Sequence, residues 1–101
     1  MSKDYYGSGL YVHMNSKEYD KNYMRVHDIM NKADGDIEKA IALAKTQANR
    51  ISVDNKAISR YRVAEFEGFK EIAEVFMRRA FELGQVDTMT YREYQLEALV
   101  G

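Results

Sequence analysis

Apolar side chains recur every three or four residues along most of this chain, which is the spacing of one face of an α-helix. The spacing predicts a first helix over about 16–33, opened by a capping box of Asn15 and Glu18. We expect Asp34-Gly35-Asp36 to end it, because glycine accepts left-handed backbone angles and aspartate caps the free N–H groups of the next helix. The apolar face of the first helix comprises Tyr19, Tyr23, Val26, Met30 and Ala33.

The same periodicity predicts a second helix over about 37–51 and a third over about 54–83. The third is the longest and holds all four phenylalanines, and its apolar stripe is wide enough for two neighbouring helices or a second copy of the chain. Gly84 ends it, and Thr90 with Glu93 opens a short last helix. The face of the second helix comprises Ile37, Ile41, Ala44, Ala48 and Ile51, and the predicted core comprises Ile41, Ala44, Ile58, Phe66, Phe69, Ile72, Phe76 and Leu83.

Residues 1–14 precede the first helical pattern and are rich in tyrosine. Apolar residues alternate with Tyr11 and His13 over 10–14, so one short strand is an interpretation of this segment. A lone strand needs a pairing partner, and an extended arm packed on the helices is the simpler interpretation. We therefore predict an all-α fold. Residues 15–101 would form one small domain of three or four helices with a long central helix, and residues 1–14 an extended N-terminal arm.

Length and composition are those of one folded domain. The chain has 101 residues, of which 46% are hydrophobic and 31% charged, which is ordinary for a folded protein. Cysteine is absent, which excludes disulfides and thiolate metal sites. No stretch approaches the ~20 apolar residues of a membrane span, and the N-terminal residues lack the apolar run of a signal peptide. We therefore expect a cytoplasmic protein that does not contact a membrane.

Few residues in the chain have the chemistry or spacing of a catalytic or metal site. His13 and His27 are the only histidines, and neither has a second ligand at a metal-binding spacing. The acids within 34–38 resemble the start of a calcium loop, but the position that needs a bidentate acid is Lys45, so helix capping explains them better. No serine lies in a nucleophile elbow. We expect no enzymatic activity, no cofactor and no bound metal.

Charge is unevenly distributed, although the net charge is only −1. Residues 39–64 hold six basic residues against one acid, interleaved with polar side chains and Tyr61, which suits phosphate contact with one stacking ring. The other interpretation is a set of solvated helix faces, or a contact with the acidic last third of another copy. The pI of the chain, near 6.1, favours these two interpretations over nucleic-acid binding, because nucleic-acid-binding domains are usually basic overall. The candidate nucleic-acid contacts are Lys45, Arg50, Lys56, Arg60 and Arg62.

Tyrosine and phenylalanine are segregated along the chain. Five of the eight tyrosines fall within the first 23 residues, whereas phenylalanine is confined to the third predicted helix. Tyrosine keeps a polar tip, which suits surfaces that are alternately wet and covered. We therefore predict a protein-binding regulator or inhibitor, of the kind that small viral and accessory proteins often are, with an unidentified protein partner and as a homodimer. Nucleic-acid binding is the alternative. The candidate partner contacts are Tyr5, Tyr6, Tyr11, Tyr19 and Tyr23.

The run MRVHDIMNKADGDIEKAI, residues 24–41, resembles the UBA-like module at the start of elongation factor Ts and of nascent-chain-associated proteins. In that family a helix ends in a similar Ala-Asp-Gly-Asp segment and the next helix begins there. The resemblance implies a compact helix-turn-helix corner that binds protein. Convergence on a well-capped turn is the alternative explanation, because capping requires the same residues. The likeness is concentrated at Gly35, Asp36, Ile37, Ala40 and Ile41.

Overall fold

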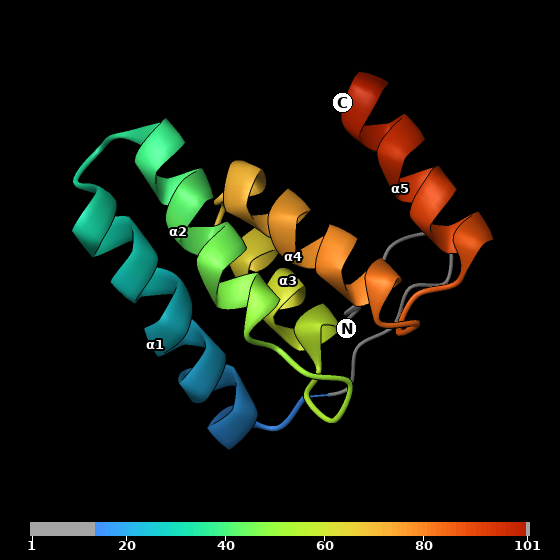
Figure 1. Cartoon of the computed structure of the whole chain (residues 1–101), viewed down its shortest axis with the longest axis horizontal. Coiled ribbons are helices and arrows are strands. Elements are labelled where there is room, and N and C mark those ends of the chain that lie inside the picture. Colours follow the sequence, from blue (N-terminus) through green and yellow to red (C-terminus); the bar gives the residue numbers. More distant parts are fainter. Residues whose placement is uncertain (1–13, 101) are drawn as a thin grey trace.

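The all-α class that the periodicity predicts is confirmed. The computed structural model describes residues 14–100, and this part of the chain forms five α-helices and no strand (Figure 1). Apart from Met14, the predicted arm, including Tyr5, Tyr6 and Tyr11, lies outside the described residues. The helices are α1 (Ser16–Ala33), α2 (Ile37–Asn49), α3 (Ala57–Phe66), α4 (Lys70–Glu82) and α5 (Thr88–Val100).

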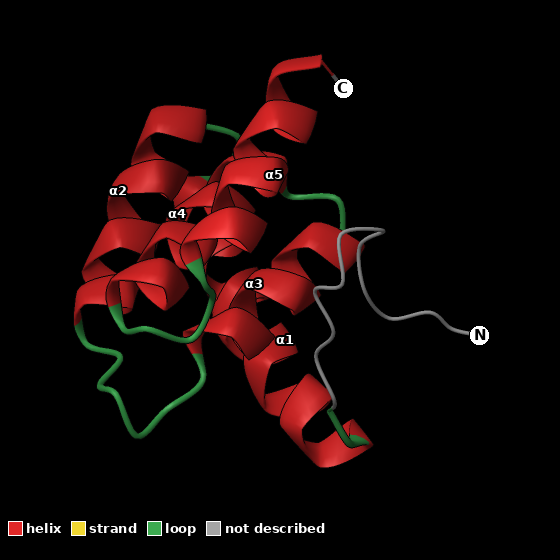
Figure 2. Ribbon diagram, turned by 90° about the vertical axis from the view of Figure 1, so that its right-hand side faces the viewer, coloured by secondary structure: helices red, strands yellow, loops and turns green. Residues whose placement is uncertain are grey.

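The first four helices pack as a closed ring. Helix α1 packs against α2 and α3, and α4 packs against α2 and α3, so each helix of the ring has two neighbours. Their inward faces enclose one core. Helix α5 contacts the ring mainly through α4, with one aromatic contact to α3, and extends away from it, as both views show (Figure 1 and Figure 2).

The corner between α1 and α2 forms as the capping residues predict. Asn15 Oδ1 accepts a hydrogen bond from Glu18 N at 2.9 Å, and Asp36 Oδ1 accepts one from Lys39 N at 3.1 Å. Asp34 and Gly35 both have positive φ, at 51° and 87°, and so reverse the chain between the two helices. The corner is therefore explained by local capping, and the resemblance to the elongation factor module stays a prediction.

The single long helix predicted over 54–83 is wrong, because the chain turns at Gly68. Helix α3 ends at Phe66 and α4 begins at Lys70. Gly68 has φ +89°, and its N–H donates to Glu65 O at 3.1 Å, while Phe69 N donates to Ala64 O at 2.9 Å. This pair of bonds around a left-handed glycine is a Schellman motif, which closes a helix by satisfying its last carbonyls. The break lets α4 fold back against α3.

Small side chains line the core where the helices meet. Eight of the buried apolar residues are alanines, and the buried residues of α2 are Ala40, Ala44 and Ala48 alone. This face is rotated from the predicted one, so Ile37 is exposed and Ile41 only partly buried. Close approach of the backbones, which alanine permits, outweighs the larger apolar area of isoleucine on this helix.

Half of the eight predicted core residues are buried. Phe76 is fully buried at its centre, but Phe66 is 68% exposed, so its prediction is wrong. Helix α3 ends at Phe66 and turns Tyr61 and Ala64 inward instead, which leaves the Phe66 ring outside the ring of helices. The predicted core residues that are buried are Ala44, Ile58, Ile72 and Phe76, and those that are partly buried are Ile41, Phe69 and Leu83.

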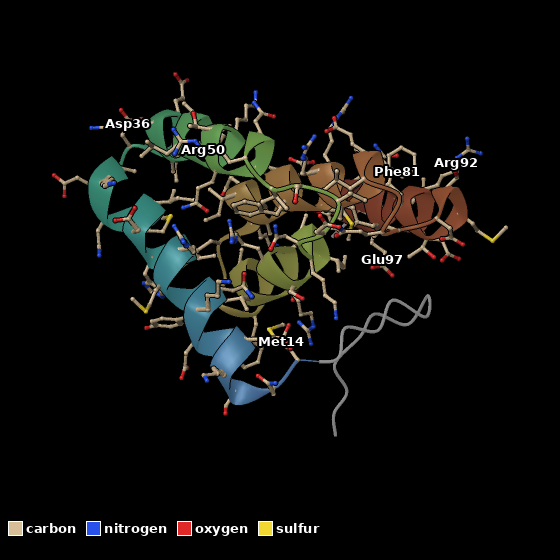
Figure 3. The ribbon with its side chains drawn as sticks, turned by 60° about the horizontal axis from the view of Figure 1, so that its bottom comes forward. Met14, Asp36, Arg50, Phe81, Arg92 and Glu97 are labelled. Carbon is tan, nitrogen blue, oxygen red and sulfur yellow. The ribbon has the colours of Figure 1, made fainter. Side chains whose placement is uncertain are left out.

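Helix α5 is the least integrated element, and none of its residues is buried. Its cap is Asp87, whose Oδ1 accepts from Thr90 N at 2.9 Å, so the prediction that Thr90 opens this helix is wrong. Aromatic contacts attach it to the ring. Tyr91 stacks on Phe81 with ring centroids 4.3 Å apart, and Tyr94 meets Tyr61 edge-on at 5.6 Å. Phe81 lies beside α5 in Figure 3.

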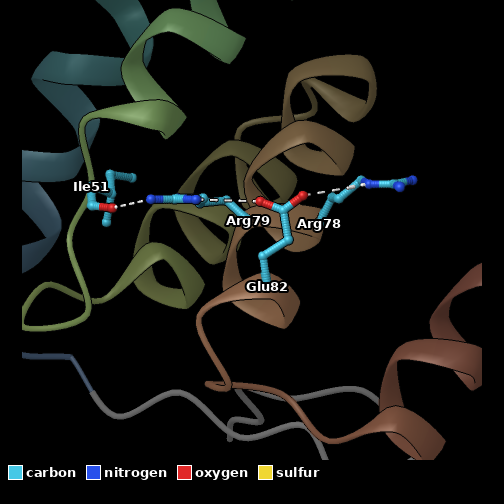
Figure 4. Close-up of polar contacts among 4 residues, drawn as sticks. All are labelled: Ile51, Arg78, Arg79 and Glu82. Carbon is cyan, nitrogen blue, oxygen red and sulfur yellow. Dashed lines mark hydrogen bonds and ion pairs between the residues drawn. The ribbon is translucent and has the colours of Figure 1, made fainter.

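Polar side chains tie the segment between α2 and α3 to the end of α4. Arg79 Nη2 donates to Ile51 O at 2.8 Å, and its Nη1 donates to Glu82 Oε1 at 3.3 Å (Figure 4). Gln85 acts on the same segment. Its Oε1 accepts from Ile58 N at 3.1 Å and its Nε2 donates to Asn55 O at 2.6 Å. Helix α3 has no side-chain cap from its own N-cap residue, so Gln85 supplies that cap from a distance.

The corrected core predicts opposite outcomes for two phenylalanines. Phe76→Ala removes a fully buried ring, and we expect the free energy of unfolding to fall by about 3–5 kcal/mol. Phe66→Ala removes a mostly exposed ring, and we expect a loss of about 1 kcal/mol or less. Urea denaturation of both variants measures this, and equal losses would mean that Phe66 is a core residue after all.

Gln85→Ala removes the side-chain partner of Ile58 N, which is partly buried, and of Asn55 O, which is exposed. We expect a loss of about 1–3 kcal/mol, the usual cost of an unsatisfied partly buried group. Gln95→Ala, an exposed glutamine on α5, is the matched control and is expected to be neutral. Equal stability of the two variants would contradict the capping role of Gln85.

Candidate functional site

One face of α1 meets the turn between α3 and α4, and together they form an aromatic surface defined by Tyr19, Tyr23, His27, Phe66 and Glu67. The three residues of α1 are four positions apart, so they stack along one side of that helix. The rings of Tyr19 and Tyr23 are 6.4 Å apart, and those of Tyr23 and His27 are 4.0 Å apart. Phe66 meets Tyr19 edge-on at 6.1 Å.

Glu67 is the polar centre of the aromatic surface. Tyr19 Oη donates to Glu67 Oε2 at 2.7 Å, and His27 Nε2 lies 3.4 Å from Glu67 Oε1. Burial and the negative charge of Glu67 raise the pKa of the Tyr19 phenol well above its ordinary value, so it stays a proton donor at neutral pH. The carboxylate thus fixes two side chains of α1 against the turn that carries Gly68.

The aromatic surface contacts the core on one side and is exposed to solvent on the other. Phe69 is partly buried and contacts the edge of His27 at 5.4 Å, which joins the surface to the core. Phe66 and Tyr23, by contrast, are exposed. A ring with Phe66's exposure leaves most of its apolar area in water, which is the property of a contact surface rather than of a core.

The structure brings together two of the five predicted partner contacts. Tyr19 and Tyr23 lie on the aromatic surface, and Tyr5, Tyr6 and Tyr11 lie outside the described residues. His27 is half-buried against neighbouring rings, in keeping with a packing role. The sequence pattern does not place Phe66 and Glu67 on this surface, because the position of both depends on the turn at Gly68. The signal that could have located them is that glycine.

The predicted basic stretch is divided between the interior and the surface. Arg60 Nε donates to Asn22 Oδ1 at 3.2 Å, and Arg60 Nη1 donates to Gln47 Oε1 at 3.1 Å. Its guanidinium lies 5.7 Å from the Phe76 ring centroid. Burial, with a smaller effect of Arg25, lowers the pKa of Arg60 to about 10. Arg60 therefore joins three helices rather than presenting its charge to a phosphate.

The other basic residues do not make one patch with Arg60. Arg62 Nη1 donates to Glu65 Oε1 at 2.9 Å and is mostly covered. Lys45 lines a groove between α2, α4 and α5, which also contains two arginines and the three glutamates Glu71, Glu74 and Glu82. Since both arginines pair with Glu82, the groove is balanced in charge and does not favour phosphate. Exposed positions remain at Arg50 and Lys56.

Residues 14–100 contain no group of three or more histidine or acidic side chains arranged to hold a metal ion. None of the helices in that range is both long and apolar enough to cross a membrane. Comparison with family models, curated proteins and solved structures finds nothing that matches this chain.

The Tyr19–Glu67 hydrogen bond predicts a dependence of stability on alkaline pH. Folding raises the pKa of Tyr19 above the ordinary 10.0, so the unfolded chain loses the phenolic proton first. The stabilising contribution of Tyr19 is therefore complete below about pH 10 and is lost as the pH rises through the raised pKa. We expect the free energy of unfolding to fall over that interval in denaturant titrations.

Tyr19→Phe isolates this effect. The variant lacks the hydrogen bond to Glu67 and is expected to be about 1 kcal/mol less stable than the wild type at neutral pH. That difference shrinks above pH 10, because ionisation of Tyr19 then stabilises the unfolded wild type, and the variant has no phenol at this position to ionise. Tyr94, whose pKa burial raises to about 12, is present in both proteins and cancels. A difference that stays constant at alkaline pH would rule out the proposed titration of Tyr19.

Proposed function

We propose that this chain is a non-enzymatic, protein-binding regulator that captures its partner through the aromatic surface. The observation that carries the proposal is the position of Phe66, a 68% exposed ring held edge-on against Tyr19 beside Tyr23. Aromatic side chains contribute most of the binding energy at many protein interfaces, because they cover a large area with few rotatable bonds. The partner would place an apolar side chain against Phe66 and Tyr23.

Preorganisation supports this assignment. Glu67 holds Tyr19 through a 2.7 Å hydrogen bond and lies beside His27, and Phe69 packs beneath His27. Rings that are already fixed lose little conformational entropy on binding, so more of the contact energy is available for affinity. Tyr23 keeps its hydroxyl at the rim, where it can exchange a water contact for a partner contact.

Protein is a better partner than nucleic acid for this chain. The net charge is −1, and Arg60 and Arg62 are used in contacts within the fold. Binding to a phosphate backbone weakens steeply with salt, by a slope of about −0.9 per phosphate contacted on duplex DNA. Binding to the aromatic surface would depend only weakly on salt, since it rests on apolar area.

A capture experiment from the native cells with two matched variants tests the proposal. Phe66 and Val53 are both 68% exposed, so Phe66→Ala and Val53→Ala remove side chains of equal exposure. We expect Phe66→Ala to lose the captured partner, with affinity reduced at least about 30-fold, as for an interface residue worth about 2 kcal/mol. Val53→Ala is expected to retain it.

Nuclease treatment and salt titration complete the design. A partner that survives nuclease, resists salt and depends on Phe66 supports the proposal. Capture that is lost with nuclease or falls steeply with salt would assign the chain to nucleic-acid binding instead. Capture that is equal for wild type, Phe66→Ala and Val53→Ala would show that the aromatic surface is not the contact.

A further inference from the structure

Helix α5 carries apolar residues on the side that faces away from the ring. On its inward side, the aromatic rings of Tyr91 and Tyr94 contact those of Phe81 and Tyr61, respectively. Its outward side exposes four large apolar side chains, between 58% and 89% of their area: Met89, Leu96, Leu99 and Val100. Helix α5 thus has apolar residues on two sides but packs against its own chain on only one of them. Its other apolar side is exposed.

Three of these four residues, Met89, Leu96 and Val100, follow a heptad. Met89 and Leu96 are seven positions apart and would be d positions, and Glu93 and Val100 would be the a positions between and after them. In this register Tyr91 and Ala98 are at f, the position that points away from a coiled-coil partner. The register therefore directs the a/d seam outward while the f positions face the chain's own ring.

Charges flank the seam with opposite signs on its two edges. In the same register Arg92 is a g position and Glu97 is the next e position, and they lie on opposite sides of α5 (Figure 3). Among the described residues neither forms an ion pair within its own chain. In two parallel helices, g of one faces the following e of the other, so Arg92 and Glu97 meet twice across a two-fold axis.

We propose that α5 pairs in parallel with α5 of a second copy of this chain. Met89, Leu96 and Val100 form the seam, and two Arg92–Glu97 ion pairs between the copies set the orientation. An antiparallel pair would bring like edges together, Arg92 near Arg92 and Glu97 near Glu97, and so is disfavoured. Each ring then lies on the outer side of its own α5, where it does not obstruct the pair.

The sequence predicted a dimer through the apolar stripe of residues 54–83, whereas this proposal places the dimer interface on α5. The apolar stripe at 54–83 that motivated it is used inside the chain, where Ile72, Phe76 and Met77 are buried against the other helices. The seam on α5 is less than two heptads long, since α5 has 13 residues, and three apolar side chains cover much less than the ~800 Å² that a stable interface buries on each partner. Glu93 of one chain would also face Glu93 of the second chain across the seam. The association is accordingly weak and reversible.

Sedimentation equilibrium of the full chain over a wide concentration range tests the proposal. We expect the wild type to pass from the 11.7 kDa monomer to a dimer as the concentration rises toward ~1 mM, the regime of a short, weak interface. Leu96→Glu, in the centre of the seam, is expected to remain monomeric. Glu93→Leu removes the two opposed carboxylates and is expected to tighten the dimer at least about tenfold.

A charge exchange tests the orientation without relying on the apolar seam. Arg92→Glu and Glu97→Arg alone each place like charges across the pair and are expected to weaken dimerisation about three- to tenfold. The double variant Arg92→Glu/Glu97→Arg restores both ion pairs and is expected to return to within about twofold of the wild type. Circular dichroism of each variant confirms that α5 remains helical.

Each alternative result overturns a named part of the proposal. A wild type that stays monomeric at ~1 mM would remove it altogether. A dimer that Leu96→Glu leaves intact would place the interface elsewhere on the chain. A dimer that is lost in Leu96→Glu but not restored by the charge exchange would exclude the parallel orientation.

Discussion

Gly68 holds a backbone angle, φ +89°, at which any side chain would be strained, and it does so where α3 ends. With that angle the N–H groups of Gly68 and Phe69 reach the last carbonyls of α3, and the chain can turn back. A continuous helix over 57–82 would be about 39 Å long, which exceeds the greatest extent of the molecule, 33 Å. In such a helix, the segments that form α3 and α4 could not pack against each other. The ring of four helices and the burial of Phe76 therefore depend on this one turn.

The same turn builds the aromatic surface. Glu67 is the C-cap residue of α3, where the negative end of the helix dipole disfavours a carboxylate. The Tyr19 hydroxyl offsets that cost by donating to Glu67 from α1, and the His27 ring lies within reach of the same carboxylate. Phe66, the last residue of α3, is left outside the core against Tyr19. A residue arrangement required for folding thus also determines which rings face the solvent and how firmly they are held.

The helix caps could be predicted from the sequence. The end of α3 could not, because there a glycine that can stop a helix lies within an apolar pattern that continues at helical spacing. Asn15 and Asp36 cap their helices as predicted, because a cap involves only the residues of one turn. Gly68 was passed over because apolar residues continue at helical spacing beyond it, and a lone glycine costs a helix only about 1 kcal/mol. Of the face predicted for the second helix, Ala44, Ala48 and Ile51 are buried but Ile37 is exposed and Ile41 only partly buried, since the distance between backbones is a property of the packed helices and not of one sequence stretch. Tyr19 and Tyr23 were identified, but their neighbours Phe66 and Glu67 depend on the turn that was missed.

A core lined by alanine separates folding from recognition. Ala40, Ala44 and Ala48 let α2 approach its neighbours closely, which leaves little volume between the helices for further large side chains. Rings and long aliphatic chains such as Phe66 and Leu96 then remain on the surface. They add little to the stability of the monomer, because they are covered by few atoms of their own chain. Such residues can be exchanged without unfolding the protein, so the surfaces of α1 and α5 can change in shape and charge while the ring of helices stays the same.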